Sequence, residues 1–330
     1  MSRLSRAETT SEGEDPRAGL RVRGFSSSGA GWERIFVSGG RVRAVWRILL
    51  FAVLFQAFLW LTRGVSDWLV PGREGLFRYG ATTLLSALAA GWVLLAWLDR
   101  RSPGALGFAW TSGVAREVVG GLAVGAGSLG LVVAGLAAAG FLSYEADGGA
   151  AGEYVSTLLG SLFVLSASAA AEEALFRGYP FQVLVQGMGP VGATLLASAA
   201  FAVAHGANPH LGWFALLNLF LAGVLLSVAY LRTRSLWFAT AVHLGWNWAM
   251  GGVLDLPVSG LELFDTPLYE PRELGPAWLT GGAFGPEGGL SGSLAVLVAL
   301  AAVIGIPAFR EAPEMRELEP LADRGREGDR

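Results

Sequence analysis

Few side chains in the apolar part of the chain could perform chemistry, and they fall into three groups. The first is the adjacent pair Glu172 and Glu173, with Arg177 four residues after the second glutamate. Polar and ionisable side chains are costly to insert into a membrane, so each one within an apolar segment is a candidate functional residue. The other two groups each contain a histidine, and they are Phe201 with His205 and His243 with Asn247.

The spacing indicates how these side chains point if the segments are helical. Residues four apart lie on one face of a helix, so the two members of each histidine group share a face. Adjacent residues point about 100° apart, so Glu172 and Glu173 must have different roles. Glu173 has the spacing of an ion pair with Arg177, which leaves Glu172 free to face another helix.

Together these groups suit the hydrolysis of an amide bond. Glu172, in an apolar site, can act as the general base that takes a proton from water, and His205 can hold the same water. His243 and Asn247 can donate hydrogen bonds to an oxyanion, and each good donor contributes about 3–4 kcal/mol. Alternatively, Glu172, His205 and His243 could bind a divalent metal such as zinc.

Two features favour a glutamate-activated water without a metal. The amide of Asn247 is a poor zinc ligand, whereas it is a good hydrogen-bond donor to an oxyanion. Glu173 is expected to be committed to Arg177, which leaves no second carboxylate to orient a metal-bound histidine. We therefore expect no cofactor, with zinc as the alternative.

Membrane helices must position these groups. The chain has 330 residues, of which 53% are hydrophobic and 15% charged, against about 25% charged in soluble domains. This composition excludes a soluble enzyme and a nucleic-acid-binding protein, and the absence of cysteine excludes thiolate catalysis and disulfides. We expect an all-α, polytopic membrane helix bundle of about eight transmembrane helices, at residues 44–62, 79–98, 118–142, 154–171, 191–206, 211–231, 236–254 and 290–307.

The remaining sequence forms two polar tails. Residues 1–43 are expected to be a disordered cytoplasmic tail, and residues 308–330 a charged cytoplasmic tail. Arginine is enriched in alternate loops, which predicts that both termini of this multi-pass cell-membrane protein face the cytoplasm. Because the catalytic groups must meet, the fourth helix is also expected to extend past Arg177.

The three groups resemble the motifs of the CPBP family, the CAAX-protease and bacteriocin-processing or Abi proteins, which includes the CAAX prenyl protease 2 type. The first motif, EExxxR, reads Glu-Glu-Ala-Leu-Phe-Arg at residues 172–177. The second, FxxxH, occupies residues 201–205, and the third, HxxxN, occupies residues 243–247. The resemblance covers residues 155–255, the motif core of a transmembrane domain spanning residues 44–307.

This resemblance implies an intramembrane endopeptidase that cleaves a membrane-associated protein or peptide within the lipid bilayer, with no nucleic-acid partner. The alternatives are a zinc-dependent protease with the same site, or a non-catalytic scaffold or transporter with a buried polar network. A rhomboid-type serine site at Ser291 is disfavoured because every histidine precedes it. The implied roles are water activation by Glu172 with His205, oxyanion binding by His243 and Asn247, and structural support from Glu173, Arg177 and Phe201.

Overall fold

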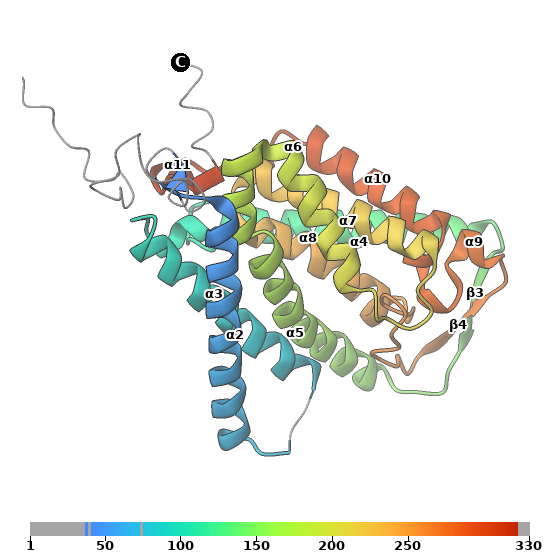
Figure 1. Ribbon diagram of the computed structural model, residues 1–330. Coiled ribbons are helices and arrows are strands. Elements are labelled where there is room, and N and C mark those ends of the chain that lie inside the picture. Colours follow the sequence, from blue (N-terminus) through green and yellow to red (C-terminus); the bar gives the residue numbers. More distant parts are fainter. Residues whose placement is uncertain (1–36, 39–40, 73–74, 323–330) are drawn as a thin grey trace, which may run out of the picture.

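The computed structural model describes residues 37–38, 41–72 and 75–322, and these form a mainly helical bundle (Figure 1). The predicted disordered tail at residues 1–43 lies mostly outside the described residues. The longer helices are α2 (Ala44–Leu69), α3 (Leu76–Trp97), α4 (Val114–Ala138), α5 (Ala151–Phe176), α6 (Tyr179–Ala204), α7 (Trp213–Thr233), α8 (Leu236–Trp248) and α10 (Leu290–Gly305).

Short elements connect these helices. The antiparallel pair β3 (Leu142–Ala146) and β4 (Tyr269–Glu273) joins the loop before α5 to the loop after α8, with Leu142 opposite Glu273. The other short elements are β1 (Val37–Ser38), β2 (Arg41–Val42), η1 (Pro103–Leu106), the π-helical turn η2 (Ala249–Val253), α9 (Ala277–Thr280), η3 (Gly282–Phe284), η4 (Pro286–Gly288) and α11 (Pro313–Glu317).

Each expected apolar segment contains a helix, but the expected count of eight crossings is not confirmed. Among the described residues, 5 helical stretches are long and apolar enough to cross a membrane, and one of them, Ala151–Ala204, combines α5 and α6. Helices α8 and α10 are shorter, at 13 and 16 residues. Large apolar side chains such as Trp60 and Val203 are exposed on the outside of the bundle, as lipid-facing side chains are. The chain is therefore a multi-pass membrane protein.

Two boundaries differ from the expected ones in ways that matter for the site. Helix α5 includes both glutamates in its last turns but ends at Phe176, so the expected continuation past Arg177 is wrong. The chain turns at Gly178, and α6 begins at Tyr179. The sequence predicts a helix that begins at residue 191, but α6 continues through Pro190 with a kink at Gly189, whose φ is 79°.

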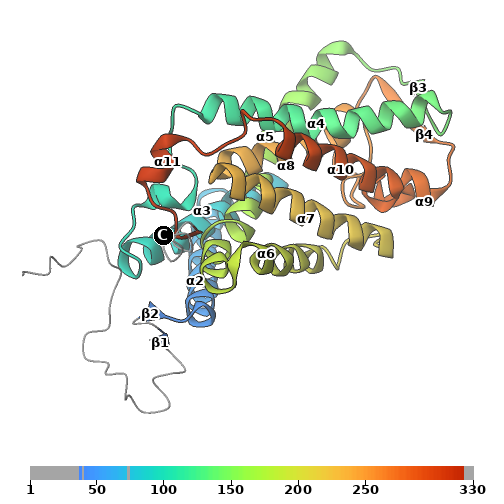
Figure 2. The same ribbon diagram turned by 90° about the horizontal axis from the view of Figure 1, so that it is seen from above.

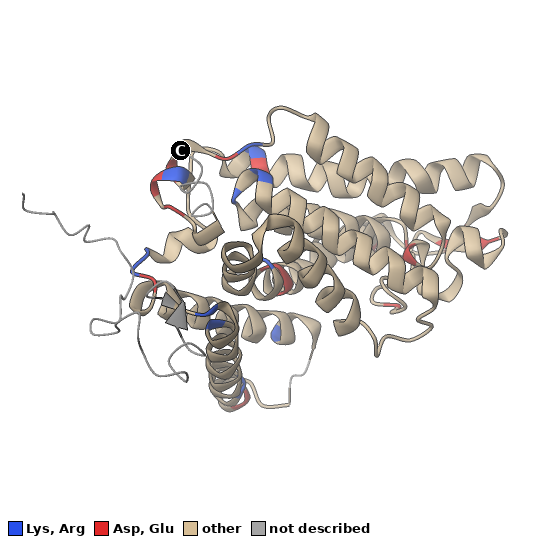
Figure 3. Ribbon diagram, turned by 45° about the horizontal axis from the view of Figure 1, so that its top comes forward, with Lys and Arg blue, Asp and Glu red and all other residues tan. Residues whose placement is uncertain are grey.

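The helices around the site run side by side. Helices α4, α7, α8 and α10 lie along one another, with β3, β4 and α9 at one end and α11 at the other (Figures 1 and 2). Helix α8 packs against α4, α5 and α7. Charged residues gather near the two ends of the bundle, and its middle is mostly uncharged (Figure 3). The few charges within the helices are therefore exceptional.

Glycines allow α4 and α8 to approach closely. A Cβ on Gly125 of α4 would lie 2.1 Å from the carbonyl oxygen of Val242, and one on Gly245 of α8 would lie 2.5 Å from that of Leu122. Small residues permit this backbone contact between membrane helices. The contact fixes α8, which carries the third motif.

A buried polar network ties the N-terminal helices to the start of α6. Arg47 of α2 donates to Asp99 Oδ1 over 2.6 Å and to the hydroxyl of Tyr179 over 3.0 Å. The Tyr179 hydroxyl in turn donates to Asp99 Oδ2 over 2.9 Å. The network thus joins α2, the end of α3 and α6.

Part of the predicted C-terminal tail is folded onto this end of the bundle. Gln182 of α6 is fully buried, and its side-chain amide donates to the carbonyl oxygen of Ala105 over 3.0 Å. Its Oε1 accepts a hydrogen bond of 2.9 Å from the backbone N–H of Leu321, which is also buried. The C-terminal segment is therefore held to α6 through Leu321, and Met315 and Ala322 of the same segment are also buried.

Candidate active site

The last turns of α5 present two glutamates in different environments. Glu173 is fully buried, whereas the side chain of Glu172 retains 34% of its exposure. This difference agrees with the divergent directions expected for adjacent helical residues.

Glu173 binds two partners through one oxygen. Its Oε1 accepts a hydrogen bond of 3.1 Å from Arg177 Nη1 and one of 2.9 Å from His243 Nδ1. The predicted ion pair with Arg177 is therefore present, but the expectation that Glu173 is committed to Arg177 alone is wrong. The same carboxylate orients the imidazole of the third motif, an interaction between residues 70 positions apart that spacing alone does not reveal.

Arg177 is held from three sides. Besides Glu173, its Nη2 donates to the carbonyl oxygen of Gly223 on α7 over 3.0 Å. Its guanidinium lies 4.7 Å from the ring centroid of Phe201, within the range of a cation–π interaction. The side chain is fully buried, and these contacts replace part of its hydration, while its Nε has no hydrogen-bond partner among the described residues. Phe201 thus supports the arginine as well as sharing a face with His205.

His205 occupies the C-terminal cap of α6, and its ring orientation is fixed by its own helix. Its Nδ1 lies 2.8 Å from the carbonyl oxygen of Phe201. A carbonyl oxygen can only accept, so Nδ1 carries the proton and Nε2 presents a lone pair in the neutral ring. That Nε2 lies 3.9 Å from Glu172 Oε2.

His243 approaches the same glutamate from α8. Its Nδ1 faces Glu173, and its Nε2 lies 3.9 Å from Glu172 Oε2. Glu172 Oε2 is buried, and no described residue donates a hydrogen bond to it. The structure therefore brings one carboxylate oxygen and two imidazole nitrogens together, as the sequence predicts. A polar molecule between them can satisfy the buried oxygen, which is costly to leave unpaired.

A cavity of about 30 Å³ extends from these groups, and Asn247 lines it together with both histidines. This volume holds about one or two water molecules. Of the predicted set, His205, His243 and Asn247 line this cavity. Glu172 is connected to it through the two histidines, since its Oε2 lies 3.9 Å from Nε2 of each. The wall of the cavity is otherwise formed mainly by apolar side chains of α7, α8 and α10.

One buried carboxylate at this cavity was not singled out from the sequence. Glu287 of η4 is 6% exposed and lines the cavity beside His243 and Asn247. Its sequence context, Gly-Pro-Glu-Gly-Gly, is typical of an exposed loop and gives no signal of burial. Ser291, in contrast, donates to the carbonyl oxygen of Pro286 over 3.1 Å and has a structural role.

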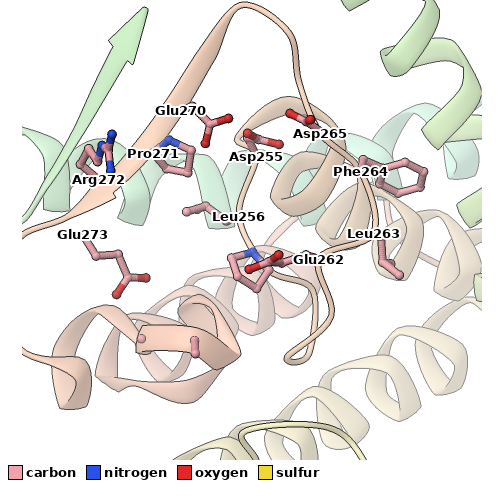
Figure 4. Close-up of a pocket in the computed structure, with 13 residues that line it drawn as sticks. Asp255, Leu256, Glu262, Leu263, Phe264, Asp265, Glu270, Pro271, Arg272 and Glu273 are labelled. Carbon is pink, nitrogen blue, oxygen red and sulfur yellow. The ribbon is translucent and has the colours of Figure 1, made fainter. Parts of the chain in front are cut away.

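A larger pocket of about 820 Å³ lies in the loop between α8 and α10, and its lining residues all fall between residues 255 and 283 (Figure 4). Carboxylate oxygens of Asp255, Asp265 and Glu270 lie within 4.8 Å of one another. Burial, together with the nearby charges of Glu270 and Asp265, raises the pKa of Asp255 to about 6. This pocket contains none of the three motifs.

Residues 154–249 match the family model described as Rce1-like, type II CAAX prenyl endopeptidase Rce1-like. The matched stretch contains most of α5, all of α6, α7 and α8, and all three motifs. It confirms the resemblance to CAAX proteases that the motifs indicate, and Glu287 lies outside it. None of the curated proteins matches the chain.

Proposed function

From the match of residues 154–249 to the Rce1-like protease family, we propose that the protein is an intramembrane endopeptidase in which Glu172 activates water. The observation that carries the proposal is the buried, unpartnered Glu172 Oε2, which lies 3.9 Å from Nε2 of both His205 and His243. A water between these atoms is within reach of a strong proton acceptor and of two further hydrogen-bonding groups.

The reaction begins when Glu172 takes a proton from this water as the water oxygen bonds to the carbonyl carbon of the peptide. His205 Nε2 accepts the second hydrogen of the water and fixes its direction. The attack produces a tetrahedral intermediate with a negatively charged oxygen. When its C–N bond breaks, protonated Glu172 returns its proton to the leaving amine.

The oxyanion is stabilised by His243 and Asn247, which line the cavity together. The amide of Asn247 is a donor without any change of state. His243 donates through Nε2 when both ring nitrogens are protonated, and the Glu173 carboxylate at its Nδ1 stabilises that charged ring. Glu173 therefore has two roles in this proposal. It pairs with Arg177 at the end of α5, and it stabilises the protonated ring of His243.

The substrate in this proposal is a peptide bond of a membrane-associated protein or peptide. The family is described as a type II CAAX prenyl endopeptidase, so a farnesylated CAAX peptide is the first probe. A transmembrane peptide without a lipid is the second. The enrichment of arginine in alternate loops further supports eight crossings of the cell membrane, with both termini on its cytoplasmic side.

Zinc is the second candidate for water activation. The Nδ1 atoms of His205 and His243 each face an acceptor, Phe201 oxygen or Glu173, as is usual for histidines that bind zinc. With Glu172 they form an N/O ligand set that would polarise water. However, the separations of 3.9 Å exceed the roughly 3.3 Å between ligands around tetrahedral zinc. This spacing supports the metal-free proposal.

The test is cleavage of both probes by protein reconstituted in lipid nanodiscs, before and after exhaustive chelation. Glu172→Gln is expected to lose all cleavage while remaining folded. The matched control is Glu153→Gln at the exposed start of α5, which should retain full activity. Asn247→Ala should lower kcat by about 10²–10³-fold, the usual loss for one oxyanion donor, with little change in KM.

Three results would contradict this proposal. Full activity of Glu172→Gln would remove the glutamate base. Stoichiometric zinc, with activity lost on stripping and restored by zinc, would make Glu172 a metal ligand. Failure of the wild-type protein to cleave either probe would favour a non-catalytic scaffold or transporter.

A further inference from the structure

The wall of the active-site cavity includes a carboxylate that the proposed reaction does not use. Glu287 comes from the short helix η4, 40 residues after Asn247 in the sequence. It is buried, and it lines the cavity together with His205, His243 and Asn247. A buried ionisable group within a membrane protein is costly, so its position calls for a role.

Both carboxylate oxygens of Glu287 accept a hydrogen bond from a neutral donor. The indole Nε1 of Trp246 donates to Oε1 over 2.9 Å, and the hydroxyl of Ser259 donates to Oε2 over 2.6 Å. The backbone oxygen of Glu287 also accepts a hydrogen bond of 2.8 Å from Asn218 of α7. One residue thus links α7, α8 and the loop after α8.

The backbone around Glu287 is held as tightly as its side chain. Gly285 has a φ of 84°, and a Cβ there would lie 2.0 Å from the carbonyl oxygen of Pro257. A Cβ on Gly288 would lie 2.4 Å from the carbonyl oxygen of Gly281. The backbone on both sides of Glu287 is therefore closely packed, which restricts the position of its side chain.

The hydrogen bonds of Glu287 argue against a direct contact with substrate. Each of its carboxylate oxygens already accepts a hydrogen bond from the protein. A positioning role remains.

The partner of Glu287 indicates what is positioned. Trp246 lies between His243 and Asn247 on α8 and directly precedes Asn247. The helix changes to a π-helical turn at Ala249, immediately after this segment. A π-helical turn interrupts the regular α-helical hydrogen bonds. A hydrogen bond to a residue outside the helix, such as that between Trp246 and Glu287, therefore helps to fix the position of the end of α8.

We propose that Glu287 is a positioning residue that holds Trp246, and through it keeps the Asn247 amide directed at the oxyanion. This inference rests on the proposed protease function and extends the active site beyond the segment that matches the family. It predicts that loss of the Glu287–Trp246 hydrogen bond lowers kcat and leaves KM almost unchanged, since substrate contacts are not altered.

The experiment compares Glu287→Ala, Glu287→Gln and Trp246→Phe in nanodiscs, using whichever of the farnesylated CAAX peptide and the unlipidated transmembrane peptide the wild type cleaves faster. Glu287→Ala and Trp246→Phe should each lower kcat by about 10–100-fold, the loss that a displacement of about 1 Å can cause. Glu287→Gln keeps an acceptor for the indole and should recover part of the activity.

The matched control is Trp248→Phe, which removes an indole on the same helix whose Nε1 donates to Leu158 oxygen over 3.0 Å, outside the cavity. It should lower thermal stability without lowering kcat. The double variant of Glu287→Ala with Trp246→Phe should be no worse than either single variant, because both remove one interaction.

Two outcomes would overturn the proposal. The first is a kcat for Trp246→Phe and Glu287→Gln that equals the value for Trp248→Phe. The second is additive loss in the double variant. Glu172→Gln, assayed alongside, distinguishes failure of the positioning role from failure of the protease mechanism. If Glu172→Gln is inactive while Glu287→Ala is fully active, only the positioning role of Glu287 is contradicted. If Glu172→Gln is active, the protease mechanism itself fails.

Discussion

At the scale of single residues, the adjacent glutamates differ in what their oxygens contact. Glu172 Oε2 is buried without a donor among the described residues, whereas Glu173 Oε1 receives Arg177 and His243 together. Glu173 Oε2 also lacks a donor among the described residues, but Glu173 is fully buried, whereas the side chain of Glu172 retains 34% of its exposure. Access to water therefore separates the two glutamates. In the third motif Asn247 lines the cavity, while both carboxylate oxygens of Glu287 accept hydrogen bonds from the protein.

Glu173→Gln is expected to lower both stability and activity. Removing the carboxylate leaves the buried Arg177 charge without its ion-pair partner, which lowers the free energy of unfolding by about 3–5 kcal/mol. It also removes the negative charge that stabilises protonated His243. Combining Glu173→Gln with Arg177→Met removes both charges, so thermal unfolding in detergent should show recovered stability. Peptide cleavage should stay low in the double variant, because His243 still lacks its carboxylate partner. Recovery of full activity would show that Glu173 acts on stability alone.

At the scale of elements, the sequence predicts the site better than the helices that hold it. The three motifs predict which residues meet, because four-residue spacing on a helix is a local property. The end of α5 at Phe176 and the early start of α6 were not predicted, since Gly178 and the buried partners of Tyr179 decide them. The Glu287–Trp246 contact was also missed, because hydropathy and turn residues describe its loop as exposed.

Gly125→Ala is expected to displace α8 from the site. The added Cβ would lie 2.1 Å from the oxygen of Val242, which precedes His243. Overpacking of this kind typically costs about 1–3 kcal/mol, and here it would also move His243 of the candidate active site. Gly127→Ala on the same helix is the control, since nothing lies within 4 Å of its Cβ. Thermal unfolding and kcat should fall for Gly125→Ala and stay near wild type for Gly127→Ala.

The loop pocket should respond to pH through Asp255. Burial raises the pKa of this carboxyl to about 6, above its ordinary value of about 3.9. The folded loop therefore binds more protons than the unfolded loop in this window, so its stability falls as pH rises from about 4 to 6. Asp255→Asn should remove this dependence, measured as backbone hydrogen exchange of residues 255–273 after correction for intrinsic pH effects. Glu262→Gln, an exposed carboxylate of the same pocket, should retain it.

At the scale of the whole molecule, charge placement predicts orientation. The enrichment of arginine in alternate loops predicts that both termini face the cytoplasm. Arg63, which lies in a loop by the sequence prediction, belongs to α2, because that helix continues to Leu69. A reporter fused after Arg330 leaves the packed segment around Leu321 intact and should read as cytoplasmic. An extracytoplasmic signal would contradict this orientation. Substrate would then reach the site from the opposite side of the membrane.

The buried network at the start of α6 bears on whether the catalytic segment can exist as an independent unit. Tyr179 and Gln182 lie inside the family-matched residues 154–249, yet their partners Asp99, Ala105 and Leu321 all lie outside it. An excised fragment would leave these buried groups without partners, at a cost of about 1–3 kcal/mol each. The packed unit that contains the matched segment therefore extends at least from Arg47 to Leu321, and we expect the motif segment alone, transferred into another protein, to fold poorly.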